Sequence, residues 1–286
     1  MQQTLKRTSL TLLISGALSV GAVNSGWAAQ VPAGVQLAQQ QNIVINNGSE
    51  VASLDPHKVE GVPESNIILN LLEGLVSTDA NGHVVPAAAA SWENQNYQQW
   101  TFHLRPGAVW SDGSPVTAQD FVYSWQRLAD PKIASPYASY LQYTKVENID
   151  DILTGKKPPQ TLGVKALDEQ TLQVTLSEPV PYFISMLSHT SLKPVKRAVV
   201  EKFGDKWTLP ANYVGNGAYR LKEWVVNERI VLERSPSYWN NKQTVINQAT
   251  FLPITSEVSD VNRFRSGEID ITNSAIPPYL YVKMKR

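Results

Sequence analysis

The sequence contains no cysteine among its 286 residues. Disulfides and thiolate metal sites are therefore excluded, and the fold has to be stabilised by burial of apolar side chains. For the same reason we expect no lipid anchor on a cysteine. An excess of either charge is also lacking, because 25 lysines and arginines balance 25 aspartates and glutamates. A nucleic-acid-binding protein would carry a basic surface, so we expect no nucleic-acid partner.

Motifs of catalysis are missing as well. The four histidines are dispersed and form no metal-ligand pair of the HExxH kind; they are His57, His83, His103 and His189. The sequence contains no Gly-x-Ser-x-Gly nucleophile turn and no phosphate-binding loop of the Walker type. We therefore expect a protein that is not an enzyme and that uses no cofactor or metal.

The only long apolar run lies near the N-terminus. Lys6 and Arg7 precede an apolar stretch over residues 10–23, and small residues follow it up to Ala28. This order is typical of a secretory signal peptide cleaved after Ala28. The run is short and contains glycine and serine, which disfavours the alternative of a membrane anchor. The sequence therefore predicts a signal peptide over residues 1–28 and a periplasmic protein.

The most informative segment covers residues 92–125. Apolar and polar residues alternate over 100–104, as in a half-buried strand, and Asp-Gly at 112–113 predicts a turn. The spacing of Thr117 and Asp120 is that of a capping box at the start of a helix. We expect the three tryptophans of the predicted strand–turn–helix unit to lie in the core: Trp100, Trp110 and Trp125.

Hydrophobic periodicity elsewhere predicts a mixed α/β chain. Asn-Gly at 81–82 lies between two valine-containing runs and predicts a hairpin. Strands are predicted over 42–46, 163–166, 171–177, 218–225, 229–234, 248–254 and 269–271. Helices are predicted over 64–75, 182–187, 196–203 and 257–266. The strand–helix–strand order over 248–271 indicates an α/β layer with a right-handed crossover. Residues 279–286 are compatible with a helix and carry no stop signal, so a natural end and a truncated chain are both left open.

Several motifs together resemble the extracytoplasmic solute-binding proteins of ABC importers, in family 5. The matching segments are residues 53–57, 60–64, 92–125, 135–137, 216–219, 238–239 and 266–270. They extend over nearly all of the chain that follows the predicted signal peptide. The oligopeptide-binding subgroup fits best, and the murein-tripeptide-binding subgroup is the nearest alternative.

The resemblance implies an α/β protein with a periplasmic-binding-protein type II fold. It places the first lobe in two segments, 42–72 and 197–286, with an inserted α+β accessory subdomain over 73–196. In the family, the second lobe follows the point at which this sequence stops. The resemblance therefore implies a truncated chain that lacks the second lobe.

The resemblance also implies a function and a set of site residues. Such proteins are monomers that bind an oligopeptide by its main chain and deliver it to an inner-membrane ABC permease. Glu60, Gly61 and Val62 match the family segment that contacts the peptide main chain, and Tyr137 matches an aromatic residue that faces the cleft. Ser274 follows the last predicted strand and is the remaining candidate. The alternatives are a solvated loop carboxylate at Glu60 and an ordinary packed tyrosine at Tyr137.

Half of the binding site is expected to be missing from this chain. The family's second lobe supplies charged partners for the peptide termini, and buried charges without partners are costly. The 286-residue chain is therefore expected to bind peptide weakly or not at all by itself. The alternative functions are a scaffold or chaperone-like protein made of one lobe, and a nickel- or haem-binding relative.

Overall fold

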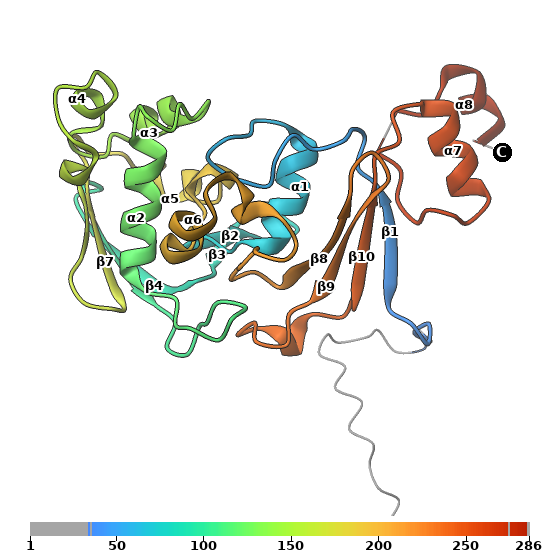
Figure 1. The fold of residues 1–286 in the computed structure, drawn as a ribbon, viewed down its shortest axis with the longest axis horizontal. Helices are drawn as coiled ribbons and strands as arrows, with labels where there is room; N and C mark the ends of the chain where they lie inside the picture. Colours follow the sequence, from blue (N-terminus) through green and yellow to red (C-terminus); the bar gives the residue numbers. More distant parts are fainter. Residues whose placement is uncertain (1–33, 35, 274, 285–286) are drawn as a thin grey trace, which may run out of the picture.

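The structure is a computed structural model that describes residues 34, 36–273 and 275–284. The predicted signal peptide lies outside the described residues. Two sheets of different make-up stand side by side (Figure 1). The mixed sheet has the strand order β1-β10-β9-β8, with β1 parallel to β10 and the other pairs antiparallel. Its strands are β1 (Asn42–Asn46), β8 (Tyr219–Val225), β9 (Arg229–Arg234) and β10 (Gln248–Leu252).

The antiparallel sheet is built from the chain between β1 and β8. Its strand order is β4-β5-β7-β6, and burial in β5 alternates residue by residue as the sequence predicts. The strands are β4 (Ala89–Gln95), β5 (Gln99–Leu104), β6 (Val164–Ala166) and β7 (Thr171–Thr175). A separate hairpin of β2 (Val76–Thr78) and β3 (Val84–Pro86) precedes it. The helices nearest to this sheet are α2 (Ala118–Ala129), α3 (Ala138–Thr144) and α4 (Ile149–Leu153).

The remaining helices lie between the sheets or at the far end of the mixed sheet. Helix α1 (Val62–Leu71) lies in the middle of the molecule, whereas α7 (Glu257–Arg265) and α8 (Pro278–Met284) form an arm beyond β1 (Figure 1). The other helices are α5 (Phe183–Met186) and α6 (Arg197–Phe203), and the 3-10 turns include η2 (Thr190–Leu192) and η3 (Gly204–Thr208). No helix in the described part of the chain has the length and apolar character needed to cross a bilayer.

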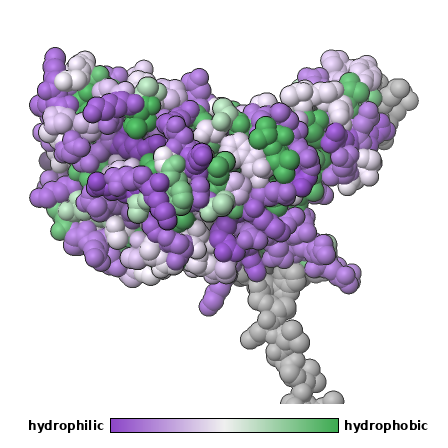
Figure 2. Space-filling view, in the orientation of Figure 1, coloured by the Kyte–Doolittle hydropathy of each residue, from purple (hydrophilic) through white to green (hydrophobic). Residues whose placement is uncertain are grey.

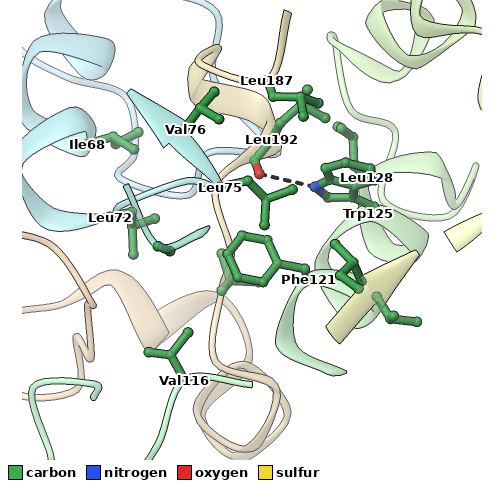
Figure 3. Packing of buried hydrophobic residues seen from close by; sticks show 14 of the residues in the cluster. Ile68, Leu72, Leu75, Val76, Val116, Phe121, Trp125, Leu128, Leu187 and Leu192 are labelled. Atoms are coloured by element: carbon green, nitrogen blue, oxygen red, sulfur yellow. Dashed lines mark hydrogen bonds between the residues drawn. The ribbon is translucent and has the colours of Figure 1, made fainter. Parts of the chain in front are cut away.

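The three tryptophans of the strand–turn–helix unit are core residues, as predicted. Trp100, Trp110 and Trp125 are 2%, 1% and 1% exposed. The indole N–H of Trp125 donates to the carbonyl oxygen of Leu192 at 3.1 Å, and the surrounding apolar side chains come from α2, β2 and the segment before η2 (Figure 3). The predicted capping box is present at the start of α2, and its Asp carboxylate also accepts from the indole N–H of Trp110 at 3.2 Å. The three tryptophans of this unit are therefore part of the hydrophobic core.

The helix predicted over 64–75 is α1, which starts two residues earlier and ends at Leu71. The carbonyl of Leu71 accepts a hydrogen bond from the amide of Gly217 at 2.9 Å. The amide of Glu73 donates to the side chain of Asn216, also at 2.9 Å. The chain before β8 thus takes over the hydrogen bonds that a longer helix would have made.

The strand predicted over 269–271 is wrong. Backbone hydrogen bonds join residues 270–271 to β1, but they form only an isolated parallel bridge between Ile271 and Ile45 and no strand. The carboxylate of Asp270 accepts from the amide of Val44 at 2.8 Å, so a side chain supplies one of the bonds that a strand would have made. Strand β4 and helices α3 and α4 were not predicted, because they are short or carry mainly polar residues.

The strands of the mixed sheet come from both sides of an insertion. They lie within residues 42–46 and 219–252, whereas all strands of the antiparallel sheet lie within 89–175. This order agrees with a lobe made of two segments around an inserted subdomain. The exact boundaries at 72/73 and 196/197 stay predictions.

Candidate functional site

The loop at the start of α1 carries three of the predicted site residues. Gly61 is the N-cap of α1 and has an extended backbone, with φ −82° and ψ 151°. The first amide groups of a helix have no partner inside that helix. Within the described chain, the amides of Gly61 and Val62 form no hydrogen bond, and Val62 is 67% exposed. The loop therefore offers backbone donors to a ligand.

The shape of this loop depends on close contact between Gly61 and Glu64. The buried carboxylate of Glu64 accepts from the amide of Ala52 at 2.8 Å with Oε1. Its Oε2 lies against Gly61, at a place where a Cβ atom on residue 61 would overlap it. Glycine at this position therefore permits the carboxylate to fold back under the loop and hold it.

Tyr137 contacts the same loop from a distant part of the sequence. It precedes α3, and its hydroxyl donates to the carbonyl oxygen of Glu60 at 3.3 Å. The side chain of Glu60 itself is exposed. The structure thus brings four predicted residues together, Glu60, Gly61, Val62 and Tyr137, although 77 positions separate Glu60 from Tyr137.

His189 packs against Tyr137 and was not predicted to belong to the site. Its ring centroid is 4.6 Å from that of Tyr137, edge to face, and 4.2 Å from that of Tyr140, stacked. Its Nδ1 accepts from the amide of Ser191 at 3.2 Å, so the proton of the neutral ring is on Nε2. Burial, followed by the charge of Lys193, lowers the pKa of His189. No local sequence pattern marks this residue, because its neighbours are set by tertiary packing.

The last predicted residue, Ser274, lies outside the described residues. Its neighbour Asn273 is exposed and donates with its amide to the carboxylate of Asp260 at 3.3 Å. The side chain of Asn273 lies next to Gly48, which follows Asn47. Asn47 in turn donates to the carbonyl of Pro63 at 3.0 Å, so this segment lies near the start of α1.

The outline of the molecule is indented beside α1. Figure 2 shows a notch in the upper outline between α1 and the arm formed by α7 and α8, with hydrophobic side chains gathered beside it. Val62 and Leu69 of α1 are the exposed apolar residues of that helix. A concave, partly apolar surface with free backbone donors is suited to an extended polypeptide.

Comparison with known proteins identifies the family. Residues 83–285 match the family described as bacterial extracellular solute-binding proteins, family 5 Middle. The match covers more than half of the chain. The chain belongs to this family of solute-binding proteins.

Relatives within the family are similar over nearly the whole chain. The periplasmic oligopeptide-binding protein OppA of Salmonella typhimurium is 64% identical over 280 residues, which are 98% of this chain and 52% of the relative. The periplasmic murein peptide-binding protein MppA of Escherichia coli is 46% identical over 268 residues, 94% of this chain and 50% of the relative. The chain thus spans about half the length of these solute-binding proteins.

Solved structures show the same fold. The crystal structure of Haemophilus influenzae OppA in complex with RPPGFSPFR matches with a TM-score of 0.86 and 55% identity. The match covers 87% of this chain and 49% of that one. The mixed α/β architecture is therefore the periplasmic-binding-protein fold of this family, as predicted, over about half of the longer chain.

Proposed function

We propose that this chain is a periplasmic solute-binding component of an ABC-type importer, which binds oligopeptides by their main chain and delivers them to a membrane permease. The observation that carries the proposal is the hydrogen bond from Tyr137 to the carbonyl of Glu60, beside the amides of Gly61 and Val62, which no described residue pairs. The similarity to proteins named as oligopeptide-binding supports it.

The loop recognises the peptide backbone. Carbonyl groups of an extended peptide accept hydrogen bonds from the amides of Gly61 and Val62, as in the addition of a strand to a sheet edge. Tyr137 holds the loop in place and lines the surface with its ring. Because backbone groups are common to all peptides, such binding tolerates different side chains. Delivery follows closure of the binding protein around its ligand.

Further properties belong to the same proposal. The chain is exported with cleavage after Ala28, carries no lipid anchor, acts as a monomer and catalyses no reaction. As a 286-residue polypeptide it binds peptide weakly, because the loop and Tyr137 contact one side of the ligand only. Charged peptide termini need partners when they are buried, and the loop and Tyr137 carry no cation for the C-terminal carboxylate and only the exposed carboxylate of Glu60 for the N-terminal ammonium.

A murein peptide is the second candidate ligand. The similarity to MppA, at 46% identity, supports it. The higher identity of 64% to OppA favours oligopeptides. A scaffold, a chaperone-like role, and nickel or haem binding have no comparable support from the site.

An NMR titration tests the proposal on the 286-residue polypeptide, since it detects weak binding. Addition of Ala-Ala-Ala is expected to shift the amide signals of Gly61 and Val62. Tyr137→Phe should weaken the effect several-fold, whereas Tyr143→Phe, on an exposed tyrosine, should not. Saturable shifts that leave residues 60–62 unchanged would overturn the proposed site. Micromolar affinity in calorimetry would refute weak binding, and a stronger response to murein tripeptide would favour the second ligand.

A further inference from the structure

A second hollow lies beside α1, and polar and apolar groups line it in about equal measure. This cavity of about 530 Å³ lies between α1, β2 and the segment 188–193, and Tyr238 contributes to its wall. Ser65, Glu73, Thr190 and Lys193 also line it. It lies next to the loop–Tyr137 site, because His189 contributes to both places.

Lys193 is the unusual residue of this cavity. Its side chain belongs to a residue only 3% exposed, yet within the described chain its ammonium group makes no hydrogen bond and no ion pair. Gly74 leaves room for it, because a Cβ atom there would lie 3.1 Å from Nζ. Lys193 lines the cavity, and because a largely buried ammonium group without an anionic partner is costly, an anion bound there would stabilise it.

Glu73 lies in the same cavity but already has other partners. Its carboxylate accepts from the hydroxyl of Tyr238 and from the indole N–H of Trp239, the latter at 2.8 Å. Arg105 stacks on the ring of Trp239, with Cζ 3.6 Å from the ring centroid. Among the described residues, Lys193 and Arg105 both interact with the carboxylate of Glu73, whose pKa is raised by burial, so the positive charge of the cluster exceeds its negative charge.

Ser65 and Thr190 add a hydrogen-bond donor to the cavity. The hydroxyl of Thr190 donates to Oγ of Ser65 at 3.2 Å. No residue in the described part of the chain accepts the hydroxyl proton of Ser65, so this proton can be donated to a ligand. Lys193 and Ser65 thus offer a cation and a neutral donor to the same space.

We propose that this cavity binds a carboxylate group, with the ammonium of Lys193 as its counter-charge and the hydroxyl of Ser65 as a second donor. The carboxylate comes from an acidic side chain, from a peptide C-terminus or from a small free acid. The inference does not depend on peptide binding at Glu60–Val62. Burial lowers the pKa of Lys193 to about 8, although the charge of Glu73 acts in the opposite direction. The group is therefore charged at neutral pH, and a bound carboxylate would raise its pKa.

The test is an NMR pH titration of the lysine ¹³Cε signals in the 286-residue protein, with and without acetate. Acetate is expected to raise the pKa of Lys193 in a saturable way and to shift the amide signals of Ser65 and Thr190. Lys193→Met, which keeps the length of the side chain, should abolish the amide shifts. Lys222→Met, on the exposed face of β8, should leave them unchanged.

Three peptides then identify the source of the carboxylate. Ala-Ala-Ala offers a C-terminal carboxylate, Ala-Glu-Ala-amide offers a side-chain carboxylate, and Ala-Ala-Ala-amide offers none. If the pKa of Lys193 rises with Ala-Ala-Ala or Ala-Glu-Ala-amide but not with Ala-Ala-Ala-amide, the site is supported. The peptide that raises the pKa then shows whether a C-terminal or a side-chain carboxylate binds. A Lys193 pKa unmoved by acetate, or amide shifts that persist in Lys193→Met, would overturn it. Shifts confined to Gly61 and Val62 would support peptide binding and refute the carboxylate site.

Discussion

Arg127 of α2 forms a bidentate ion pair with Asp55 in the loop after β1, with nitrogen–oxygen distances of 2.9 and 2.6 Å. Both side chains are buried, and the carboxylate also accepts from the indole N–H of Trp207 at 3.2 Å. Burial raises the pKa of Asp55, but the hydrogen bond and charge of Arg127 and the hydrogen bond from the amide of His57 outweigh it and lower the pKa. The pair joins the helix beside the antiparallel sheet to the segment that leads out of the mixed sheet.

Loss of Arg127 should destabilise the protein strongly. Arg127→Met leaves the carboxylate of Asp55 buried with one cation fewer, and such losses cost about 3–5 kcal/mol. Urea unfolding measures the change in the free energy of unfolding. The matched control is Arg229→Met, which removes half-exposed pairs with Glu223 and Glu228 and should cost about 1 kcal/mol or less. Equal costs for the two variants would contradict a structural role for the buried pair.

His57 should make the stability depend on pH. Burial and then the charge of Arg127, whose Nη1 lies 2.6 Å from Nδ1, lower the pKa of His57 to about 3. The unfolded chain, with a histidine pKa near 6.5, binds more protons between these two values. The free energy of unfolding should therefore fall by about 1.4 kcal/mol for each pH unit as the pH drops below about 6.5.

Urea unfolding at pH 7, 6 and 5 measures this slope. His57→Gln should flatten it, whereas His83→Gln, on an exposed turn, should leave it as it is. Asp55 should lower the free energy of unfolding further in more acidic solution. Its pKa is lower in the folded protein than the value near 3.8 of the unfolded chain, so its stabilising contribution is complete above that pH and is lost as the pH falls below it. A slope unchanged in His57→Gln would show that other groups control the acid sensitivity.

The elements that were predicted correctly are those with local causes. The alternation in β5 and the capping box of α2 depend on residues a few positions apart, so the sequence contains the whole signal. The end of α1 depends on Gly217, almost 150 residues away, and no local pattern could reveal it. The bridge at Ile271 likewise forms only because β1 lies beside it.

The site shows the same division between local and distant causes. Resemblance to a family pointed to Glu60–Val62 and Tyr137, and the structure places them in contact. His189 and Lys193 could not be found in this way, because their place in a site depends on the residues that pack around them in the folded protein. A lysine at position 193 reads as an ordinary surface residue until Gly74 and the cavity beside it are seen.

Trp125 should contribute to stability without contributing to ligand recognition. Trp125→Phe removes the hydrogen bond to Leu192 and leaves a cavity next to Leu75, at an expected cost of about 2–4 kcal/mol. Denaturant unfolding measures the cost. The peptide-induced shifts at Gly61 and Val62 should stay the same under conditions where the variant is folded. Loss of these shifts in a folded variant would show that the tryptophan unit acts on the site.

The contact between Gly61 and Glu64 can be tested by a double-mutant cycle. In Gly61→Ala, the new Cβ atom overlaps the carboxylate of Glu64, which has to move and to give up its hydrogen bond to Ala52. We expect a loss of about 1–3 kcal/mol in the free energy of unfolding. The backbone angles of Gly61 are open to alanine, so the strain comes from this contact and not from the main chain.

The sign of the effect should therefore reverse when the carboxylate is removed. Against a Glu64→Ala background, Gly61→Ala should be neutral or stabilise by about 0.4–1 kcal/mol, because alanine restricts the unfolded chain more than glycine does. Urea unfolding of the four proteins gives the coupling energy between the two positions. The same destabilisation by Gly61→Ala in both backgrounds would mean that another contact requires glycine there. A large coupling energy would establish that the buried carboxylate sets the shape of the proposed peptide-binding loop.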